Sequence, residues 1–477
     1  MSAPRFALVG HPNKGKSSLV STLARDTSVR IGPEPGTTVA AREFPLRVDG
    51  RLLYVLVDTP GFQRARAALD WMKQAEEGAG SRSAVVARFV SEHEHDERFQ
   101  HECELLRPLV AGAGLIYVVD GATPYGPEYD AEMEILRWTG QPSLAVINPI
   151  GVPRFVEPWS RALEQFFRVV RVIDVQRAPF AQQVALLEAF GQMRDAWHRP
   201  VEEAVAALTN HRAQQQDDAA QAIAELLGQS LTHRESRDIG KHEDAAPHTA
   251  KLEQDYRGKL RQLERRTREA VEAIYGFDDL DREEADMARL DSDLLSRESW
   301  LAFGLKKRDL VIAGAAGGAI TGGVVDTSFL GASLLMGTMI GGVVGGALGY
   351  FSSDKLAEAK VMRQPLGGQR LRYGPTRNTQ FPFVLLNRAI LHHAVVADRT
   401  HAQRDTLRLL GAEAGKGDDD TRAAVTYPDG VTRDLTRVFA RLRRAEAGSA
   451  SRSAAQADLA EIVSRLITSL EGPAPGA

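Results

Sequence analysis

The chain has 477 residues, of which 43% are hydrophobic and 26% are charged, and its formal net charge is −4. This length predicts roughly two to four domains, and the composition excludes a disordered chain. The near-neutral charge excludes a global attraction to nucleic acid, and the single cysteine, Cys103, excludes an internal disulfide.

The first predicted strand leads into a phosphate-binding loop. Residues 1–5 precede this strand without a signal peptide, so we expect a cytosolic head. The apolar run ends at Gly10, and Gly15-Lys16-Ser17 opens a predicted helix after four intervening residues. This G-x-x-x-x-G-K-S pattern surrounds phosphates with backbone N–H groups, while its lysine contacts the β- and γ-phosphates and its serine binds Mg²⁺. The predicted nucleotide-binding residues of this loop are Gly10, His11, Pro12, Asn13, Lys14, Gly15, Lys16, Ser17 and Ser18.

Two further motifs follow in the order that phosphate-loop enzymes use. The Pro/Gly-rich stretch 31–39 carries adjacent threonines, Thr37 and Thr38, where a switch segment would place one threonine on Mg²⁺ and the γ-phosphate. A predicted hairpin then ends at Asp58-Thr59-Pro60-Gly61. Its aspartate is placed to hold Mg²⁺ through water, and the N–H of Gly61 is placed to face the γ-phosphate.

With these three motifs the sequence resembles the Era and TrmE group of GTPases. The matching residues are Gly10-His11-Pro12-Asn13-Lys14-Gly15-Lys16-Ser17, Gly36-Thr37-Thr38 and Asp58-Thr59-Pro60-Gly61. The resemblance implies that GTP is bound and hydrolysed, and that Thr38 rather than Thr37 is a Mg²⁺ ligand. It also implies that Asn13 binds K⁺ in place of an arginine finger. The expected catalytic residues are then Lys16, Thr38 and Gly61, and the expected Mg²⁺ ligands are Ser17, Thr38 and Asp58.

The sequence departs from this group at two positions. Apolar Phe62 stands where Ras-like enzymes carry the glutamine that orients water, so hydrolysis must position its water in another way or be slow. A later predicted strand ends at Asn148-Pro149-Ile150-Gly151, where relatives carry Asn-Lys-x-Asp. Asn148 is retained as a nucleotide-binding residue, but the aspartate that reads guanine is missing. Preference for guanine over adenine is therefore left open.

Residues 62–109 are more than a minimal second switch needs. They contain His93, His95 and His101 with neighbouring carboxylates, which predicts either a divalent-metal site or, as we favour, a solvated helix face. We interpret this insertion as a partner-facing or mobile switch element.

The remaining strands and helices of the first part complete a known fold. Apolar strands predicted at 114–121, 143–147 and 167–175 alternate with helices predicted at 127–138 and 180–197. The prediction is an α/β P-loop NTPase domain, with a mostly parallel sheet and helices on both faces.

The second part of the sequence is predicted to be helical and to contain a glycine zipper. Glycines recur every four residues at Gly314, Gly318 and Gly322, and again at Gly337, Gly341, Gly345 and Gly349. On helices this spacing allows close pairing in lipid, so residues 310–351 predict a helical hairpin in a membrane or, alternatively, a hairpin buried in a soluble domain. The predicted segments are a GTPase domain at 1–199, a charged coiled-coil-like region at 200–305, a glycine-zipper hydrophobic hairpin at 306–355 and a C-terminal helical region at 356–477.

These features predict a membrane-associated GTPase switch with Mg²⁺ and K⁺ as cofactors and GTP, GDP and membrane lipid as partners. Its head is expected at the inner face of a membrane, held there through residues 310–351, and its helical region is a candidate surface for a homo-oligomer. The alternative is a weakly hydrolysing nucleotide-binding module, with relaxed guanine specificity, that controls a helical scaffold or membrane assembly. Nucleic acid is not an expected partner, because no basic patch with interleaved aromatics is present.

Overall fold

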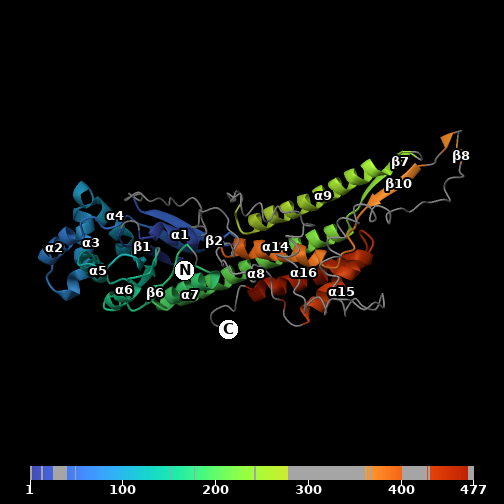
Figure 1. The fold of residues 1–477 in the computed structure, drawn as a ribbon. Helices are drawn as coiled ribbons and strands as arrows, with labels where there is room; N and C mark the ends of the chain where they lie inside the picture. The colour runs from blue at the N-terminus through green and yellow to red at the C-terminus, as the bar shows by residue number, and fades with distance from the viewer. Residues whose placement is uncertain are drawn as a thin grey trace. The chain divides into compact units, whose positions relative to one another are not determined.

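The computed structural model describes residues 3–11, 14–24, 40–48, 50–150, 152–176, 178–240, 243–277, 360–361, 364–365, 368–399, 427 and 430–470. The chain divides into two compact units (Figure 1). The first consists mainly of Met1–Ala213, and the second of Gln214–Ala397 and Thr406–Gly472.

A six-stranded sheet with the order β2-β3-β1-β4-β5-β6 forms the centre of the first unit. β2 is antiparallel to β3, and every other pair of neighbours is parallel. The described strands are β1 (Arg5–Val9), β2 (Arg42–Val48), β3 (Arg51–Asp58), β4 (Gly114–Asp120), β5 (Ser143–Asn148) and β6 (Val170–Val172).

Helices cover both faces of this sheet, which explains why its central strands are continuous apolar runs. Along β1, Ala7 and Val9 belong to one hydrophobic cluster, while Phe6 and Leu8 belong to the cluster on the opposite face. The helices are α1 (Lys16–Ala24), α2 (Ala65–Gln74), α3 (Arg82–Glu92), α4 (Gln100–Val110), α5 (Glu128–Trp138), α6 (Val156–Leu163), α7 (Phe180–Gly191) and the start of α8 (Asp195–Thr232). The predicted α/β P-loop fold of this part is confirmed.

A helical insertion lies between β3 and β4 in the first unit. It consists of α2, α3 and α4, with short 3-10 turns at Ala79–Ser81 and Glu97–Phe99. Phe89 and Cys103 are buried in the same hydrophobic cluster as Val9 of β1. The insertion is therefore packed against the sheet rather than projecting from it.

Among the residues that the structure describes, the second unit combines a helical bundle with two antiparallel strand pairs. α14 (Phe381–Ala397) is buried along most of its length and packs against α9 (Ala245–Ile274). α15 (Val431–Arg444) and α16 (Ala450–Leu470) contribute to the same hydrophobic core. One pair joins β7 (Glu235–Gly240) to β10 (Gly368–Tyr373), and a second short pair joins β8 (Lys360–Val361) to β9 (Gln364–Pro365).

The structure differs from the sequence predictions at several boundaries. The strand predicted at 167–175 is limited to β6, and the helix predicted at 180–197 is broken between α7 and α8. β7 lies inside a region that the sequence predicts to be entirely helical. The strand could not be predicted from the sequence, because its exposed Ser and Arg residues give no apolar alternation. None of the described helices is long and apolar enough to cross a membrane. The predicted hairpin at 310–351 lies outside the described residues.

Candidate functional site

The two glycines of the phosphate loop are required by its geometry. Gly10 has φ +147° and Gly15 has φ +88°, which is backbone that other residues rarely adopt. A Cβ on Gly10 would lie 2.3 Å from the carbonyl oxygen of Val118, and one on Gly15 would lie 2.2 Å from Nδ2 of Asn148. The loop is therefore folded tightly against β4 and the end of β5.

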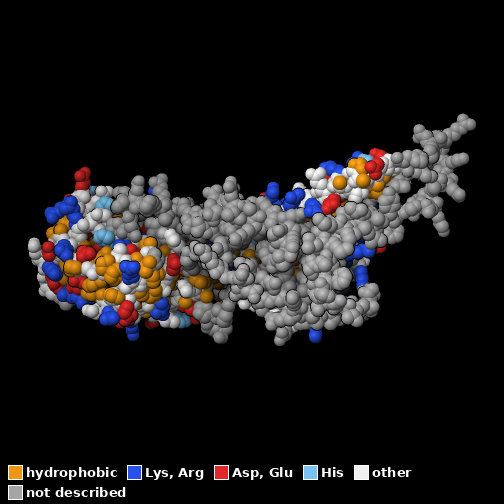
Figure 2. Space-filling view, viewed as in Figure 1, with side chains coloured by type: hydrophobic (Ala, Val, Ile, Leu, Met, Phe, Trp, Pro, Cys, Tyr) orange, Lys and Arg blue, Asp and Glu red, His pale blue; other side chains and the backbone are white. Residues whose placement is uncertain are grey.

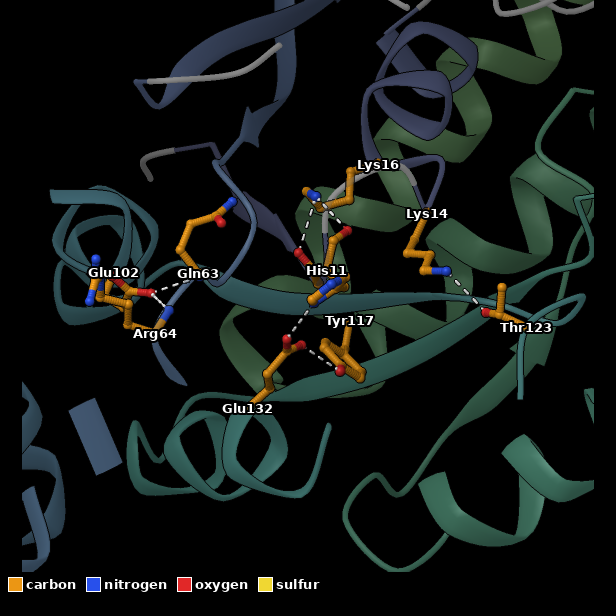
Figure 3. A network of polar contacts seen from close by, with 10 residues as sticks. His11, Lys14, Lys16, Gln63, Arg64, Glu102, Tyr117, Thr123 and Glu132 are labelled. Carbon is orange, nitrogen blue, oxygen red and sulfur yellow. Dashed lines mark hydrogen bonds and ion pairs between the residues drawn. The ribbon is translucent and has the colours of Figure 1, made fainter. Parts of the chain in front are cut away.

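Lys16, the first residue of α1, is held across the loop. Its Nζ donates to the carbonyl oxygens of Gly10 at 3.1 Å and of His11 at 3.0 Å, as Figure 3 shows. Burial lowers the pKa of the Lys16 ammonium to about 8, although the carboxylates of Asp58 and Glu132 favour its charged form. A buried cation whose hydrogen bonds to described residues go to two neutral carbonyls is well suited to exchange them for phosphate oxygens.

The predicted Mg²⁺ ligands Ser17 and Asp58 meet in the structure. Ser17 Oγ donates to Asp58 Oδ2 at 2.8 Å, although the two residues are 41 positions apart in sequence. Parallel pairing of β1 with β3 brings them together, with Leu8 opposite Asp58, and Thr59 Oγ1 donates to the carbonyl oxygen of Leu8 at 2.6 Å. A hydroxyl and a carboxylate are hard oxygen donors of the kind that Mg²⁺ prefers, so these residues fit that ion.

A buried polar network supports the loop from below (Figure 3). Nδ1 of His11 lies 3.0 Å from Oε1 of Glu132 on α5, and the Tyr117 hydroxyl donates to Oε2 of Glu132 at 2.8 Å. Burial, together with the neighbouring Glu132, raises the pKa of the Tyr117 hydroxyl well above its usual value, which keeps it a donor. The network fixes the first half of the loop to β4 and α5.

Lys14 is turned away from Lys16 and toward the end of β4. Its Nζ donates to Thr123 Oγ1 at 3.0 Å and lies 3.5 Å from Oδ2 of Asp120. The two lysines of the loop therefore face different surroundings, and Lys16 is the one placed across it (Figure 3).

Asn148 connects the phosphate loop to the chain after β6. Its Nδ2 donates to the carbonyl oxygen of Lys14, and its Oδ1 accepts from the N–H of Val175, both at 3.3 Å. The side chain is 2% exposed. The structure thus places Asn148 beside the loop as an internal brace.

The chain after Asn148 has Pro149 and Gly151 at the positions expected to carry a lysine and an aspartate, and it exposes the apolar side chains of Ile150 and Val152. Ile150 is 45% exposed and Val152 is 62% exposed. Figure 2 shows hydrophobic side chains gathered on the visible face of the first unit, over the region of α5 and α6. This loop offers no carboxylate to a base.

The loop after β3 is held by a carboxylate from the insertion. Oε1 of Glu102 on α4 accepts from the N–H groups of Gln63 at 2.8 Å and Arg64 at 2.6 Å (Figure 3). Phe62 is 1% exposed and packs in the sheet-facing core. On the same helix, Glu104 accepts from the N–H of Ala41, just before β2, at 3.2 Å.

The histidine-rich part of the insertion has packing contacts rather than ligand geometry. The ring of His93 stacks on Phe89, and the Cys103 thiol donates to the carbonyl oxygen of His93 at 3.4 Å. Burial raises the pKa of Cys103 to about 11. Within the described part of the chain, no group of three metal-binding side chains is present.

Several predicted site residues are brought together, and others lie outside the described residues. Gly10, Lys16, Ser17 and Asp58 gather where β1 and β3 end, and Gly61 lies three residues after the end of β3. Pro12, Asn13, Thr37 and Thr38 lie outside the described residues. Sequence reasoning missed Glu102, Glu104, Tyr117 and Glu132, because no local pattern reveals which helical carboxylate points to a distant loop.

Comparison with known proteins assigns the two parts of the chain separately. The family model described as "50S ribosome-binding GTPase" (MMR_HSR1) matches residues 5–148, and the model described as "Domain of unknown function (DUF3482)" matches residues 160–468. The first part is thus a P-loop GTPase domain.

Curated relatives match the amino-terminal part. GTPase Der of Mycoplasma pneumoniae is 47% identical over 90 residues, covering 18% of this chain and 20% of that protein. GTPase Der of Desulforudis audaxviator is 27% identical over 184 residues, covering 35% of this chain and 41% of that protein. The chain therefore spans less than half the length of these relatives.

Solved structures of GTPases are similar at low sequence identity. A structure of Aquifex aeolicus Era bound to GDP.AlF4⁻ has 15% identity and a TM-score of 0.28, covering 58% of this chain and 90% of that chain. A structure of NFeoB from S. thermophilus bound to GDP.AlF4⁻ and K⁺ has 16% identity and a TM-score of 0.25, covering 58% and 97%.

Proposed function

We propose that this chain, which belongs to the DUF3482 family and carries a P-loop GTPase domain before that region, binds GTP and hydrolyses it to GDP and phosphate. The observation that carries this proposal is the 2.8 Å contact between Ser17 Oγ and Asp58 Oδ2, next to the buried Lys16. The GTPase Der relatives support the same activity.

The phosphate loop binds the phosphates through the side chain of Lys16 and through backbone N–H groups. Lys16 exchanges the carbonyls of Gly10 and His11 for oxygens of the β- and γ-phosphates, which stabilises their charge. The positive φ angles of Gly10 and Gly15 let the backbone N–H groups between them turn toward the phosphates.

Ser17 and Asp58 would hold Mg²⁺, Ser17 directly and Asp58 through water. When bound, this ion neutralises charge that develops on the phosphates during in-line attack by water. The N–H of Gly61 follows the same strand end and is proposed to sense the γ-phosphate. Thr38 as a further Mg²⁺ ligand and Asn13 as a K⁺ ligand remain proposals that rest on the family resemblance.

The identity of the base rests on the relatives. The contacts of Asn148 to Lys14 and Val175 support a role in bracing the loop, and the apolar side chains that follow it supply no guanine-reading carboxylate. We therefore propose GTP as the ligand with a weaker preference over ATP than a site built with such a carboxylate gives.

We also propose that the GTPase domain acts at a membrane. The glycine spacing in residues 310–351 supports a lipid-embedded hairpin that would hold the head at the inner face of a membrane. Flotation of full-length protein with vesicles of neutral lipid, against a variant that lacks residues 310–351, tests this proposal. Equal flotation of the two proteins would contradict it.

A second candidate function is a nucleotide-binding module that hydrolyses slowly and controls the helical unit. The observation that favours it is the burial of Phe62, which removes a side chain from the position that orients water in Ras-like enzymes. Single-turnover hydrolysis with and without K⁺ and lipid separates the two, since the module would stay at the uncatalysed rate under all conditions.

Calorimetric titration with GTP, GDP, ATP and ADP in Mg²⁺ tests the leading proposal. We expect wild-type protein to bind GTP and GDP, Lys16→Ala to lose this binding, and Lys73→Ala, which removes an exposed lysine from α2, to retain it. Unchanged affinity in Lys16→Ala would refute the proposed site. Equal affinity for GDP and ADP would refute the guanine preference alone.

A further inference from the structure

The loop that follows β3 is fixed by a buried carboxylate. Glu102 is 0% exposed, and its Oε1 accepts both the N–H of Gln63 and the N–H of Arg64 (Figure 3). Its Oε2 is buried and has no hydrogen-bond partner among the residues that the structure describes. Burying a carboxylate is unfavourable unless its contacts are good, so this arrangement holds the loop at a substantial free-energy cost.

The effect of this contact is to set which side chain of the loop faces solvent. Phe62 is buried in the core, whereas the next residue, Gln63, is exposed. The side-chain amide of Gln63 makes no hydrogen bond to any described residue, and the contact of Gln63 with Glu102 is through the backbone N–H. Figure 3 shows this amide extending from the loop on the side of Lys16.

If Glu102 served only to cap α2, it would bind the first N–H groups of that helix, and it does not. α2 begins at Ala65, so the two N–H groups held by Glu102 belong to the cap residue Arg64 and to Gln63 before it. The first helical N–H groups are not the ones bound. Glu102 therefore fixes the approach to the helix, which is the stretch directly after Gly61.

We propose that Gln63 orients the water that attacks the γ-phosphate, and that Glu102 is the positioning residue that presents it. This inference rests on the proposed function. An amide can accept a hydrogen bond from water and donate one to a phosphate oxygen. Phe62, directly after Gly61, occupies the position of the water-orienting glutamine of Ras-like enzymes, but its side chain is buried. Gln63 is the next residue and the first in this loop with an exposed amide.

The reaction is hydrolysis of the terminal anhydride. The water oxygen forms a bond to the γ-phosphorus while the bond from that phosphorus to the β–γ bridging oxygen breaks. The electron pair of the broken bond leaves with GDP. One proton of the water stays on its oxygen and the other moves to an oxygen of the γ-phosphate, so that both end on the inorganic phosphate as dihydrogen phosphate. Gln63 contributes orientation only and is neither oxidised nor protonated.

Single-turnover GTP hydrolysis by full-length protein, with GTP affinity measured in parallel, tests the role of Gln63. Gln63→Ala is expected to lower the hydrolysis rate about 10- to 100-fold, because misplacing the water has an effect of that order. Its GTP dissociation constant is expected to stay within about twofold, since the amide contacts water rather than the bound ground state. The matched control is Gln74→Ala, which removes an exposed glutamine at the end of α2 and should hydrolyse at the wild-type rate.

Two variants of Glu102 test the positioning role. Glu102→Gln keeps an oxygen that can accept the two N–H groups and should retain most of the rate, whereas Glu102→Leu should lose as much as Gln63→Ala without a matching loss of affinity. The double variant Glu102→Leu/Gln63→Ala should be no slower than either single variant. Thermal melting of Glu102→Leu confirms that folded protein is compared.

The outcomes separate this inference from the proposed function. If wild-type protein hydrolyses GTP and Gln63→Ala matches Gln74→Ala, the role of Gln63 is refuted and the GTPase assignment stands. A rate in Glu102→Gln as low as in Glu102→Leu refutes the positioning role of Glu102. Wild-type protein that binds GTP but never exceeds the uncatalysed rate refutes both the hydrolase function and the role of Gln63.

Discussion

Ser17 Oγ and Asp58 Oδ2 lie 2.8 Å apart at the adjacent carboxyl ends of β1 and β3. The serine comes from the start of α1 and the aspartate from the last position of β3, so their contact depends on the pairing of two strands that are far apart in sequence. Their oxygens form one side of the proposed Mg²⁺ site.

Replacing the aspartate should weaken Mg²⁺ binding and so raise the Mg²⁺ concentration that nucleotide binding requires. Asp58→Asn keeps the shape and a hydrogen-bond acceptor but removes the charge that the ion needs. We expect the Mg²⁺ concentration for half-maximal GTP binding to rise about tenfold or more, which is the size of the loss in metal affinity when residues around a metal site are replaced. Asp70→Asn, at an exposed position of α2, is the matched control. Identical Mg²⁺ titrations for wild type and Asp58→Asn would contradict the assignment.

Adding a methyl group to the second loop glycine should abolish nucleotide binding while leaving the domain folded. In Gly15→Ala the new Cβ would lie 2.2 Å from Nδ2 of Asn148, and φ +88° would be strained. We expect GTP affinity to fall at least about 100-fold, with a loss of stability of about 1–3 kcal/mol. Gly80→Ala, where a Cβ meets no atom within 4 Å, should match wild type in both measurements. Retained affinity in Gly15→Ala would show that the loop tolerates the shift.

Sequence patterns were sufficient for the P-loop fold and for the residues that are consecutive in its motifs. The apolar runs and the glycine spacing specify β1, the loop and α1, because each of these depends on local conformation. The contacts of Glu102 and Glu132 could not be predicted, because they depend on how separate helices pack on the sheet. β7 was missed for a related reason, since it is stabilised by pairing with β10, more than a hundred positions later.

The free energy of unfolding should depend on pH through Lys16. Burial lowers the pKa of this lysine from its usual 10.5 to about 8 in the folded protein. Below pH 8 the lysine is charged in both the folded and the unfolded state, so the folded state bears the full cost of burying the charge. Between pH 8 and 10.5 the unfolded state binds more protons than the folded state, so the free energy of unfolding rises with pH. Lys16→Met keeps the stem without the charge, so it should stabilise the protein at pH 7 by on the order of 3 kcal/mol.

Urea unfolding at pH 7 and at pH 9.5 measures this difference. The gain in Lys16→Met over wild type should shrink at the higher pH, because wild-type Lys16 is then largely neutral in the folded state. Lys73→Met, at an exposed position of α2, is the matched control. A gain that grows with pH would mean that the ammonium is stabilised rather than penalised in the folded loop.

The second unit contains a buried ion pair whose two halves should be interdependent. Arg388 of α14 donates through Nε to Glu264 of α9 at 2.8 Å and through Nη2 at 3.2 Å, with side-chain exposures of 0% and 5%. Removing one partner leaves a buried charge, so Arg388→Met should lower the free energy of unfolding by about 3–5 kcal/mol. The double variant Arg388→Met/Glu264→Leu should recover much of this loss, because apolar residues can replace a buried ion pair at little net cost.

Chemical denaturation of the full chain, followed by a probe in the second unit, measures these effects. Arg465→Met is the matched control, because Arg465 pairs with Glu461 at 70% and 72% exposure and such surface pairs contribute about 0–1 kcal/mol. A double variant as unstable as Arg388→Met would show that packing around α14, rather than the uncompensated charge of Glu264, dominates the loss. A single variant within about 1 kcal/mol of wild type would show that Glu264 finds another partner or takes up a proton when Arg388 is removed.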